Sequence, residues 1–216
     1  MPIITISRMF GSGGSEIAAR VAEQLGWELL DNEVVDAVAL RLGASREDVA
    51  AREERVPSLV ERLASTMALS SQEWLAPVGD AQMPPSDDRL VEMTKRVVAE
   101  AVARGPVVVV GRGAQSMLAA REDALHVFCY APRAALIRRT VEREGIDEQQ
   151  AAKLVDDTNK QRLEWVRKHW SREWRAHENY HLSVDTEWFS ISGTVQLVVG
   201  IARTRFQNAT RAQGPP

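Results

Sequence analysis

The chain has 216 residues, of which 44% are hydrophobic and 26% are charged. This composition excludes a collagen, a mucin-like repeat and a wholly disordered chain, and the length suits one sizeable domain or two small ones that fold without a metal or disulfides. The 27 lysines and arginines against 30 aspartates and glutamates give a net charge of −3, which argues against a general binder of nucleic acids or anionic membranes.

The single cysteine, Cys129, excludes a disulfide framework and a cysteine-rich zinc site, and it suits a reducing compartment. No apolar stretch approaches the ~20 residues that a membrane span needs. The N-terminal residues Met1–Ile6 are too short and too uncharged for a signal peptide. We therefore expect a cytoplasmic protein without a membrane segment, and the sequence carries no signal for an oligomeric state.

The N-terminal residues predict a strand, a glycine-rich loop and a helix. Ile3–Ser7 are apolar and β-branched, and the loop from Arg8 to Ser15 follows them. Apolar residues then recur near helical spacing from Ile17 to Leu25, and glycine follows as a helix stop. A second short strand is expected at Trp27–Asp31. The segment from 32 to 88 is expected to form a helical insert that ends in a proline-rich surface loop.

The rest of the chain alternates helices with short apolar strands. The uninterrupted β-branched run Val107–Val110 is typical of a buried parallel strand. Asp147, with Gln150 three residues later, matches a capping box that opens a long helix. In order, the expected elements are a helix Arg89–Gly105, strands Val107–Val110 and His126–Tyr130, helices Pro132–Gly145 and Asp147–Trp170, a strand His181–Val184, a helix from Ile191 to about Phe206 and a polar, disordered tail at 207–216. This alternation predicts an α/β fold with a doubly wound parallel sheet.

The glycine loop is the strongest local signal for a ligand. In an open α/β sheet, the loop between the first strand and the first helix points its amides into the crevice at the carboxyl ends of the strands. Glycines there allow positive φ and close approach of the backbone, and the helix N-terminus adds about +0.5 charge. The loop therefore predicts phosphate binding, and the alternative is a plain strand-to-helix turn. Its candidate phosphate-binding residues are Gly11, Ser12, Gly13, Gly14 and Ser15.

The loop departs from the ordinary phosphate-loop pattern G-x-x-x-x-G-K-[ST] at two positions. With Gly13 as the second glycine, Arg8 stands in the place of the first glycine and Gly14 in the place of the lysine. Ser15 keeps the hydroxyl position. The cation that normally reaches the β- and γ-phosphates is therefore absent from its usual place.

Further motifs accompany the glycine loop in a fixed order along the chain. They are Ile4–Arg8, Phe10–Gly14, Ala18–Leu25, Leu30–Asp31, Val109–Gly113, Phe128–Pro132, Arg138–Arg139, Glu142–Ile146, Asp185–Thr186 and Val195–Val198. On these stretches the chain resembles the cytidylate kinase-like family of P-loop kinases, and 32–88 matches only in its helical character. The resemblance implies a three-layer α/β/α P-loop kinase fold in a single domain, 1–206, with a five-stranded parallel sheet, a helical acceptor-binding insert at about 32–88 and a helical lid at about 146–177. The core is then 1–31, 89–145 and 178–206.

The resemblance also implies roles on the side of the phosphate donor, with ATP and Mg²⁺ as cofactors. Arg8 is expected to act as a substitute cation over the ATP phosphates, and the alternative is a surface pair with Glu16. Ser15 is expected to coordinate Mg²⁺ or only to cap the helix, and it stands where the family often has a second arginine. Arg139 and Arg162 are expected to neutralise the transferred phosphoryl group.

On the acceptor side, the resemblance implies four residues. Asp31 is expected near the acceptor and the metal, or as a helix cap. Arg112 is similar to the family's Gly-Arg that grips the acceptor's phosphate, whereas Gly113 replaces an aspartate that reads cytidine. Asn159 replaces the acid of the lid's Asp-x-x-Arg and is expected near the acceptor. Asp185 is expected to make only minor nucleotide contacts, or to cap a helix.

The lid segment 160–177 is locally basic, with six lysines and arginines against two glutamates. Trp165, Trp170 and Trp174 interleave with these charges. Such segments can stack nucleobases, but packing of the lid on the core is the favoured interpretation. The four histidines have no metal-ligand spacing.

We predict an ATP-dependent phosphotransferase that moves the γ-phosphate to a nucleoside monophosphate such as CMP or dCMP. Gly113 and the insert leave open a kinase for a non-nucleotide small molecule. The absent lysine leaves open a nucleotide-binding protein without turnover. A single-strand nucleic-acid binder is disfavoured by the overall acidity. The expected partner is therefore a small-molecule phosphate acceptor.

Overall fold

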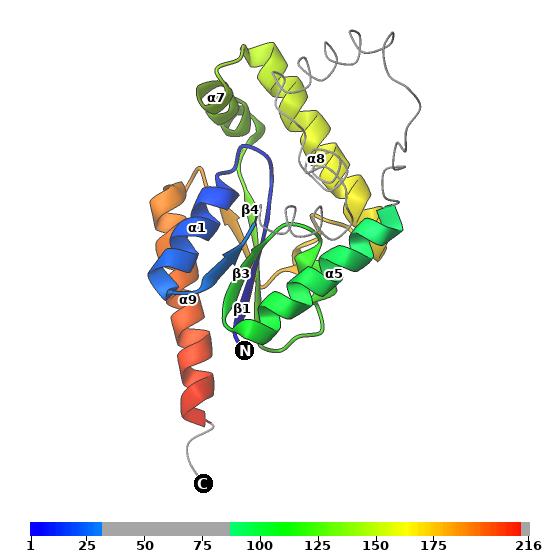
Figure 1. The fold of residues 1–216 in the computed structure, drawn as a ribbon. Coiled ribbons are helices and arrows are strands. Elements are labelled where there is room, and N and C mark those ends of the chain that lie inside the picture. Colours follow the sequence, from blue (N-terminus) through cyan, green and yellow to red (C-terminus); the bar gives the residue numbers. More distant parts are fainter. Residues whose placement is uncertain (32–86, 213–216) are drawn as a thin grey trace, which may run out of the picture.

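The computed structural model describes residues 1–31 and 87–212 (Figure 1). The expected helical insert therefore lies outside the described residues, apart from Asp87 and Asp88, which begin a helix. The elements are β1 (Ile3–Arg8), α1 (Gly14–Leu25), β2 (Glu28–Leu30), α5 (Asp87–Arg104), β3 (Val107–Val110), α6 (Ala114–Met117), β4 (Ala124–Tyr130), α7 (Arg133–Glu144), α8 (Glu148–Trp170), a 3₁₀ turn (His177–Asn179), β5 (Leu182–Asp185) and α9 (Ser190–Ala212).

The five strands form one parallel sheet in the order β2-β3-β1-β4-β5. Ile6 of β1 pairs with Val110 of β3 on one side and with Val127 of β4 on the other. The predicted five-stranded parallel α/β fold is therefore confirmed. The carboxyl ends of β1 and β3 lie side by side, so the loops that follow these two strands share one edge.

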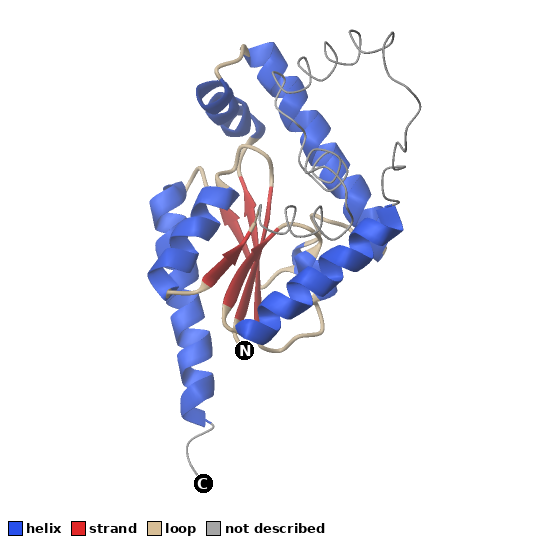
Figure 2. Ribbon diagram, in the orientation of Figure 1, coloured by secondary structure: helices blue, strands red, loops and turns tan. Residues whose placement is uncertain are grey.

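Helices cover both faces of the sheet, as Figure 2 shows. Alternate residues of each buried strand point to opposite sides. On one face, Val107 and Val109 pack in a core with α5. On the other, Val108 and Val110 pack with α1 and α9. Because strands buried on both faces must be apolar throughout, the run Val107–Val110 has the composition that the position requires.

Helices α7 and α8 form a hairpin beyond the carboxyl edge of the sheet (Figure 1). Its core combines Leu136 and Ile137 with Ala151 and Val155, and Phe10 of the glycine loop packs against it. Asp147 caps α8 by accepting a hydrogen bond from the backbone of Gln150 at 2.8 Å, as the sequence predicts. The hairpin thus contacts the loop that the lid is expected to cover.

The C-terminal helix is longer than the sequence analysis expects. Helix α9 ends at Ala212 instead of about Phe206, so the prediction of a disordered tail is wrong for 207–212. Residues 207–212 contain neither glycine nor proline, and the first glycine stands at 214, so nothing in the sequence stops the helix earlier. Within 1–31 and 87–212, no helix combines the length and apolar character needed to cross a bilayer.

Candidate functional site

A pocket of about 590 Å³ lies at the carboxyl edge of the sheet. The loop between β1 and α1 forms one wall, Arg139 and Arg143 of α7 form a second, and Ile191 of α9 closes a third side. Three of the lining side chains are arginines, and the N-terminus of the 12-residue helix α1 opens into the same space. Backbone amides, a helix N-terminus and arginines together are suited to binding a polyanion such as a phosphate chain.

The glycine loop is shaped by two positive φ angles. Gly11 has φ 81°, and a Cβ there would lie 2.6 Å from the carbonyl oxygen of Leu136, so the loop approaches α7 more closely than any side chain allows. Gly13 has φ 78° and stands at the N-cap of α1. The hydroxyl of buried Ser12 donates to the carbonyl of Met9 at 2.7 Å. The backbone amide of Ser12 donates to the same Met9 carbonyl at 3.1 Å, so both hydrogen-bond donors of Ser12 stabilise the loop itself.

Arg8 and Gly14 are in direct contact. A Cβ at Gly14 would lie 2.3 Å from Cβ of Arg8 and 2.8 Å from its Cγ. Because carbon atoms do not approach so closely, a lysine at position 14 has no room while arginine stands at position 8. The two departures from the phosphate-loop pattern are therefore one structural feature, in which the aliphatic stem of Arg8 occupies the space beside position 14.

The guanidinium of Arg8 points toward the end of β2. Its Nη2 lies 3.9 Å from Oδ1 of Asp31, and both side chains are largely buried. The alternative pair with Glu16 is not formed, since Glu16 pairs with Arg20 one turn along α1. The structure thus brings together two residues from the predicted site, Arg8 and Asp31, that are far apart in the sequence.

Two lid residues hold the glycine loop by its backbone. The side-chain oxygen of Asn159 accepts a hydrogen bond from the Phe10 amide at 2.9 Å, and Nη1 of Arg162 donates to the Arg8 carbonyl at 2.7 Å. Both α8 side chains are buried. The sequence analysis expects both near substrates, and this structure shows each of them in contact with the backbone of the glycine loop.

Phe10 is a site residue whose role the sequence analysis misses. The guanidinium carbon of Arg143 lies 4.6 Å from the centre of the Phe10 ring, and that of Arg162 lies 5.9 Å from it. Cations over an aromatic face are attracted by the ring's quadrupole. Phe10 therefore connects the glycine loop to both helices of the hairpin. Its position directly before the first loop glycine is the only sequence signal for this role.

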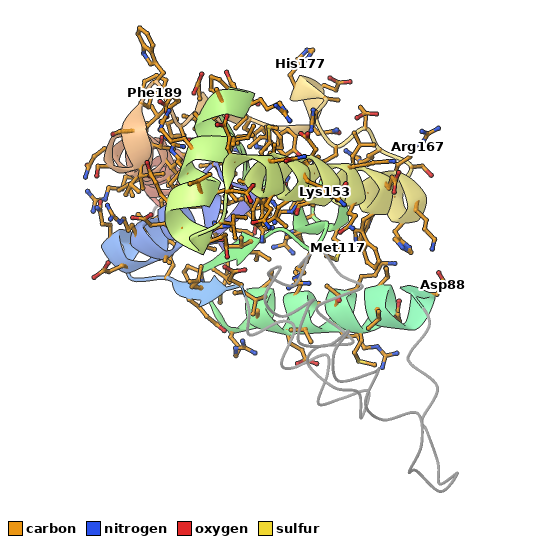
Figure 3. The ribbon with its side chains drawn as sticks, turned by 90° about the horizontal axis from the view of Figure 1, so that it is seen from above. Asp88, Met117, Lys153, Arg167, His177 and Phe189 are labelled. Atoms are coloured by element: carbon orange, nitrogen blue, oxygen red, sulfur yellow. The ribbon has the colours of Figure 1, made fainter. Side chains whose placement is uncertain are left out.

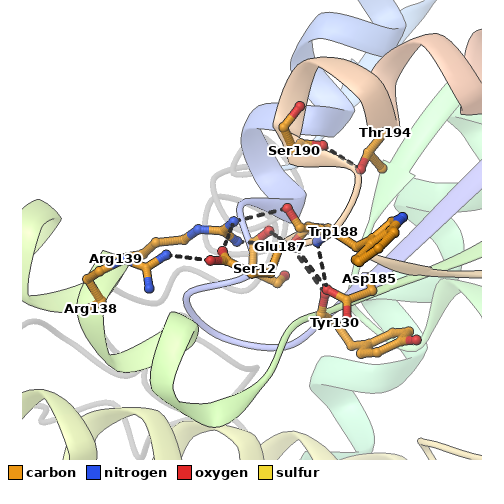
Figure 4. A network of polar contacts seen from close by, with 10 residues as sticks. Ser12, Tyr130, Arg138, Arg139, Asp185, Glu187, Trp188, Ser190 and Thr194 are labelled. Atoms are coloured by element: carbon orange, nitrogen blue, oxygen red, sulfur yellow. Dashed lines mark hydrogen bonds and ion pairs between the residues drawn. The ribbon is translucent and has the colours of Figure 1, made fainter.

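The turn after β5 is tied to the glycine loop (Figure 4). The hydroxyl of Thr186, which is fully buried, donates to the carbonyl of Ser12 at 2.8 Å. Arg139 donates to that same hydroxyl and to the Thr186 carbonyl, both at 3.0 Å, and pairs with Glu187 at 2.7 Å. Arg139 thus lines the pocket while its two terminal nitrogens, Nη1 and Nη2, fix it to this turn.

Asp185 caps the turn after β5 and not a helix, since α9 begins only at Ser190. Its Oδ1 accepts hydrogen bonds from the amides of Glu187 and Trp188 at 2.9 and 3.2 Å. Glu187 also pairs with Arg138, which is half exposed at the surface. These contacts stabilise the turn between β5 and α9.

Arg112 follows β3 in an unusual backbone turn. Gly111, Arg112 and Gly113 all have left-handed φ angles, of 65°, 57° and 67°. The left-handed conformation costs a residue with a Cβ roughly 1–2 kcal/mol, and such strain concentrates at functional sites. The Arg112 side chain is only 3% exposed. A strained, buried arginine at the carboxyl edge fits the role of holding an anionic acceptor.

The end of α8 lies against this turn. Viewed from above, α8 lies over the sheet, with Lys153 and Arg167 along its length (Figure 3). Its last residue, Trp170, contacts Gly113. Trp174 is buried against Phe128 in an edge-to-face contact with ring centres 5.5 Å apart, so packing of this tryptophan on the core is confirmed.

Oxygen donors suitable for Mg²⁺ are present beside the pocket. Ser15 is exposed in the first turn of α1, and the Asp31 carboxylate lies at the end of β2. Among residues 1–31 and 87–212, no three histidine, cysteine, aspartate or glutamate side chains gather into a metal cluster. This donor set fits an ion that binds through phosphate oxygens and few protein ligands, as Mg²⁺ does.

Burial raises the pKa of the Cys129 thiol to about 12, so this thiol does not act as a nucleophile.

Comparisons with known proteins agree with this geometry. A family model described as "Cytidylate kinase-like family" matches residues 3–188. No curated protein matches the chain. A solved structure of an uncharacterized protein from Eubacterium ventriosum is 18% identical, with 94% of this chain and 98% of that one covered and a TM-score of 0.67. Shikimate kinase from Acinetobacter baumannii, in complex with shikimate, is 16% identical over 95% of each chain, with a TM-score of 0.53. A gluconokinase from Sinorhizobium meliloti is 14% identical, covers 99% and 98%, and has a TM-score of 0.53. These likenesses show the P-loop kinase fold.

Proposed function

The chain belongs to the cytidylate kinase-like family, and from this premise we propose that it transfers the γ-phosphate of ATP to a nucleoside monophosphate such as CMP or dCMP. The observation that carries the proposal is the contact between Arg8 and Gly14. Arg8 lies beside position 14, where the lysine is missing, and it lines the same pocket as the glycine loop. The absence of the lysine therefore does not by itself argue for a protein without turnover.

On the donor side, the loop amides and the N-terminus of α1 bind the ATP phosphates. Arg8 supplies the positive charge, and Arg139 and Arg143 add theirs from the opposite wall of the pocket. Phosphoryl transfer needs positioning and neutralisation of charge more than covalent chemistry. Asn159 and Arg162 contribute by fixing the loop backbone, so that the amides are already oriented before the nucleotide binds.

On the acceptor side, Arg112 holds the acceptor's phosphate and Asp31 orients Arg8. An oxygen of the acceptor's phosphate attacks the γ-phosphorus, a new oxygen–phosphorus bond forms, and the bond to the β-phosphate oxygen breaks to release ADP. The attacking phosphate oxygen carries no proton, so the step needs no general base. Ser15 and Asp31 would hold Mg²⁺, which when bound supplies further charge neutralisation at the phosphates.

The test exchanges the two unusual loop residues. Arg8→Ala removes the cation, and we expect kcat/KM to fall roughly 10²- to 10³-fold in an ATP-to-ADP assay with CMP. Gly14→Lys alone is expected to be inactive, because the new side chain clashes with Arg8. The double variant Arg8→Gly with Gly14→Lys recreates the ordinary pattern and is expected to exceed the Arg8→Ala rate at least tenfold. Unchanged turnover in Arg8→Ala contradicts the role of Arg8.

A panel of acceptors, run beside an ATP-binding titration, tests the reaction itself. Turnover with CMP or dCMP supports the proposal. Turnover only with a hydroxyl-bearing small molecule such as shikimate or gluconate replaces the acceptor class and keeps the kinase. Tight ATP binding without turnover on any acceptor contradicts the proposal in favour of a nucleotide-binding protein.

A further inference from the structure

The residue after Arg112 has no side chain, and a tryptophan from α8 fills the space. A Cβ built at Gly113 would lie 2.5, 2.6 and 2.9 Å from three ring carbons of Trp170, namely Cη2, Cζ3 and Cζ2. Each of these distances is far below a carbon–carbon contact. Any residue other than glycine at position 113 therefore displaces the indole ring, and the positive φ of Gly113 adds strain to such a substitution.

The C-terminal end of α8, which carries Trp170, is attached to α6 through the chain that follows it. Trp170 is the last residue of α8, and Ser171 ends the helix in the left-handed conformation with φ 52°. The chain that follows returns to α6, where the side-chain amide of Gln115 donates to the Asn179 carbonyl at 2.7 Å. Arg172 donates to the side chain of the same Asn179 at 2.9 Å. The end of α8 is thus anchored to the helix that Gly113 begins.

Trp170 also ends a row of rings along α8. The centres of Trp165 and His169 are 4.2 Å apart, and those of His169 and Trp170 are 5.9 Å apart. Trp170 itself is only partly buried. Trp170 is a partly exposed indole against Gly113, the residue that follows buried Arg112, and a flat apolar surface near a positive charge matches a planar ring that carries an anionic group.

We propose that Trp170 makes the acceptor site selective for compounds with a planar ring. Its indole fills the space that a side chain at position 113 would take, and it stacks against the ring of the acceptor. The inference rests on the proposed function, because it takes Arg112 as the residue that holds the acceptor's phosphate. It names the acceptor class as a phosphorylated compound with a planar ring. Selectivity among bases is then weak, since every base offers a flat face to an indole.

The experiment measures acceptor affinity by calorimetry with CMP in the absence of ATP. Stacking on an aromatic side chain contributes enough that Trp170→Leu should raise the dissociation constant of CMP roughly 10- to 100-fold. Trp170→Phe keeps a ring and should lose far less. Trp188→Leu, at a tryptophan that is 83% exposed on the β5–α9 turn, is the matched control and should leave CMP affinity unchanged. Affinity for ATP in Trp170→Leu should match the wild type, which also reports on folding.

Gly113→Ala provides an independent arm. It leaves Trp170 in the chain but drives the ring from its place, so CMP affinity should fall as in Trp170→Leu. If wild type and Trp170→Leu bind CMP equally well, the inference is wrong while the proposed function stands. If wild type binds no nucleotide acceptor but binds shikimate or gluconate, the proposed acceptor class and the stacking role of Trp170 are both wrong, because neither compound offers a planar aromatic ring or a phosphate.

Discussion

Two pockets of nearly equal volume open at opposite edges of the sheet, about 590 Å³ at the carboxyl edge and about 560 Å³ at the amino edge. The first is built from glycine backbone at positive φ and from arginines that face it. The second is lined by Arg121 and Arg205, of which Arg121 pairs with Asp123 and Arg205 donates to the Glu122 carbonyl. Volume therefore does not distinguish a site from a surface hollow. Backbone strain and buried polar groups distinguish the site at the carboxyl edge from a surface hollow. Such features cost stability, and they persist where a ligand is bound.

The largest expected effect is the loss of activity on substitution of Arg112, at the carboxyl edge of the sheet. We expect Arg112→Ala to lower kcat/KM for the acceptor roughly 10²- to 10³-fold, because the buried cation is lost. Arg112→Gly should lose the same activity but be more stable than Arg112→Ala by about 1 kcal/mol, since glycine adopts the φ of 57° without strain. Steady-state kinetics and thermal unfolding of both variants check this. Equal stability of the two would contradict the assignment of strain.

The next effect is at Thr186, which joins the turn after β5 to the glycine loop. Thr186→Val removes the donor to the Ser12 carbonyl and the acceptor of Arg139 while keeping the shape of the side chain. A buried polar group left without its partner costs roughly 1–3 kcal/mol. We expect a loss in the free energy of unfolding near the upper end of this range, together with weaker ATP binding. Urea unfolding and an ATP titration measure the two, and unaltered ATP affinity would show that the turn does not support the loop.

At the amino-terminal half of the sheet, the expected effect concerns stability and pH. Burial, with a smaller contribution from the neighbouring His181, lowers the pKa of His126 from 6.5 to about 4. The unfolded chain therefore binds a proton as the pH falls below 6.5, and the folded chain does so only near pH 4. Stability is highest above 6.5 and falls toward pH 4, by about 2 kcal/mol between pH 7.5 and 5. Urea unfolding at both pH values measures it, and His126→Gln, which carries no titrating ring, should flatten the profile.

The smallest expected effect is a loss of stability on substitution of Asp123, at the amino edge of the sheet. Its carboxylate pairs with Arg121 at 2.7 Å and with the N-terminal amine at 2.8 Å, and these contacts hold the pKa of Asp123 well below its usual range. The group is about one-third exposed, so Asp123→Asn should cost less than 1 kcal/mol. Turnover should be unchanged. A fall in turnover would mean that the amino edge does take part in function.

The sequence predicts the parts of the site that local patterns encode. The glycine loop, Asp31 and Arg112 each follow a predicted strand, and the carboxyl ends of parallel strands meet at one edge. The cap by Asp147 is equally local. What the pattern does not encode is how α8 packs on the loop. Asn159 is 149 residues away from Phe10 in the chain, and Arg162 is 154 residues away from Arg8, so these contacts depend on how the whole hairpin is placed.

The sequence pattern also does not explain why the loop departs from the phosphate-loop motif at both Arg8 and Gly14. A scan of the sequence shows an arginine at position 8 and a glycine at position 14 as separate losses. Only in three dimensions does one side chain exclude the other. Likewise, the sequence shows Gly113 only as the loss of a side chain that could read the acceptor. The structure shows in addition that the ring of Trp170 fills the space of that side chain.

The contact between Arg8 and Gly14 has a consequence for how this loop can change over generations. A lineage that carries lysine at position 14 cannot gain arginine at position 8 without a clash, and a lineage with arginine at position 8 cannot gain lysine at position 14. A change from one form to the other by single substitutions passes through a loop that either contains the clash or lacks both side chains. Branches of descent should therefore keep one arrangement or the other, and chains that mix the two should be rare.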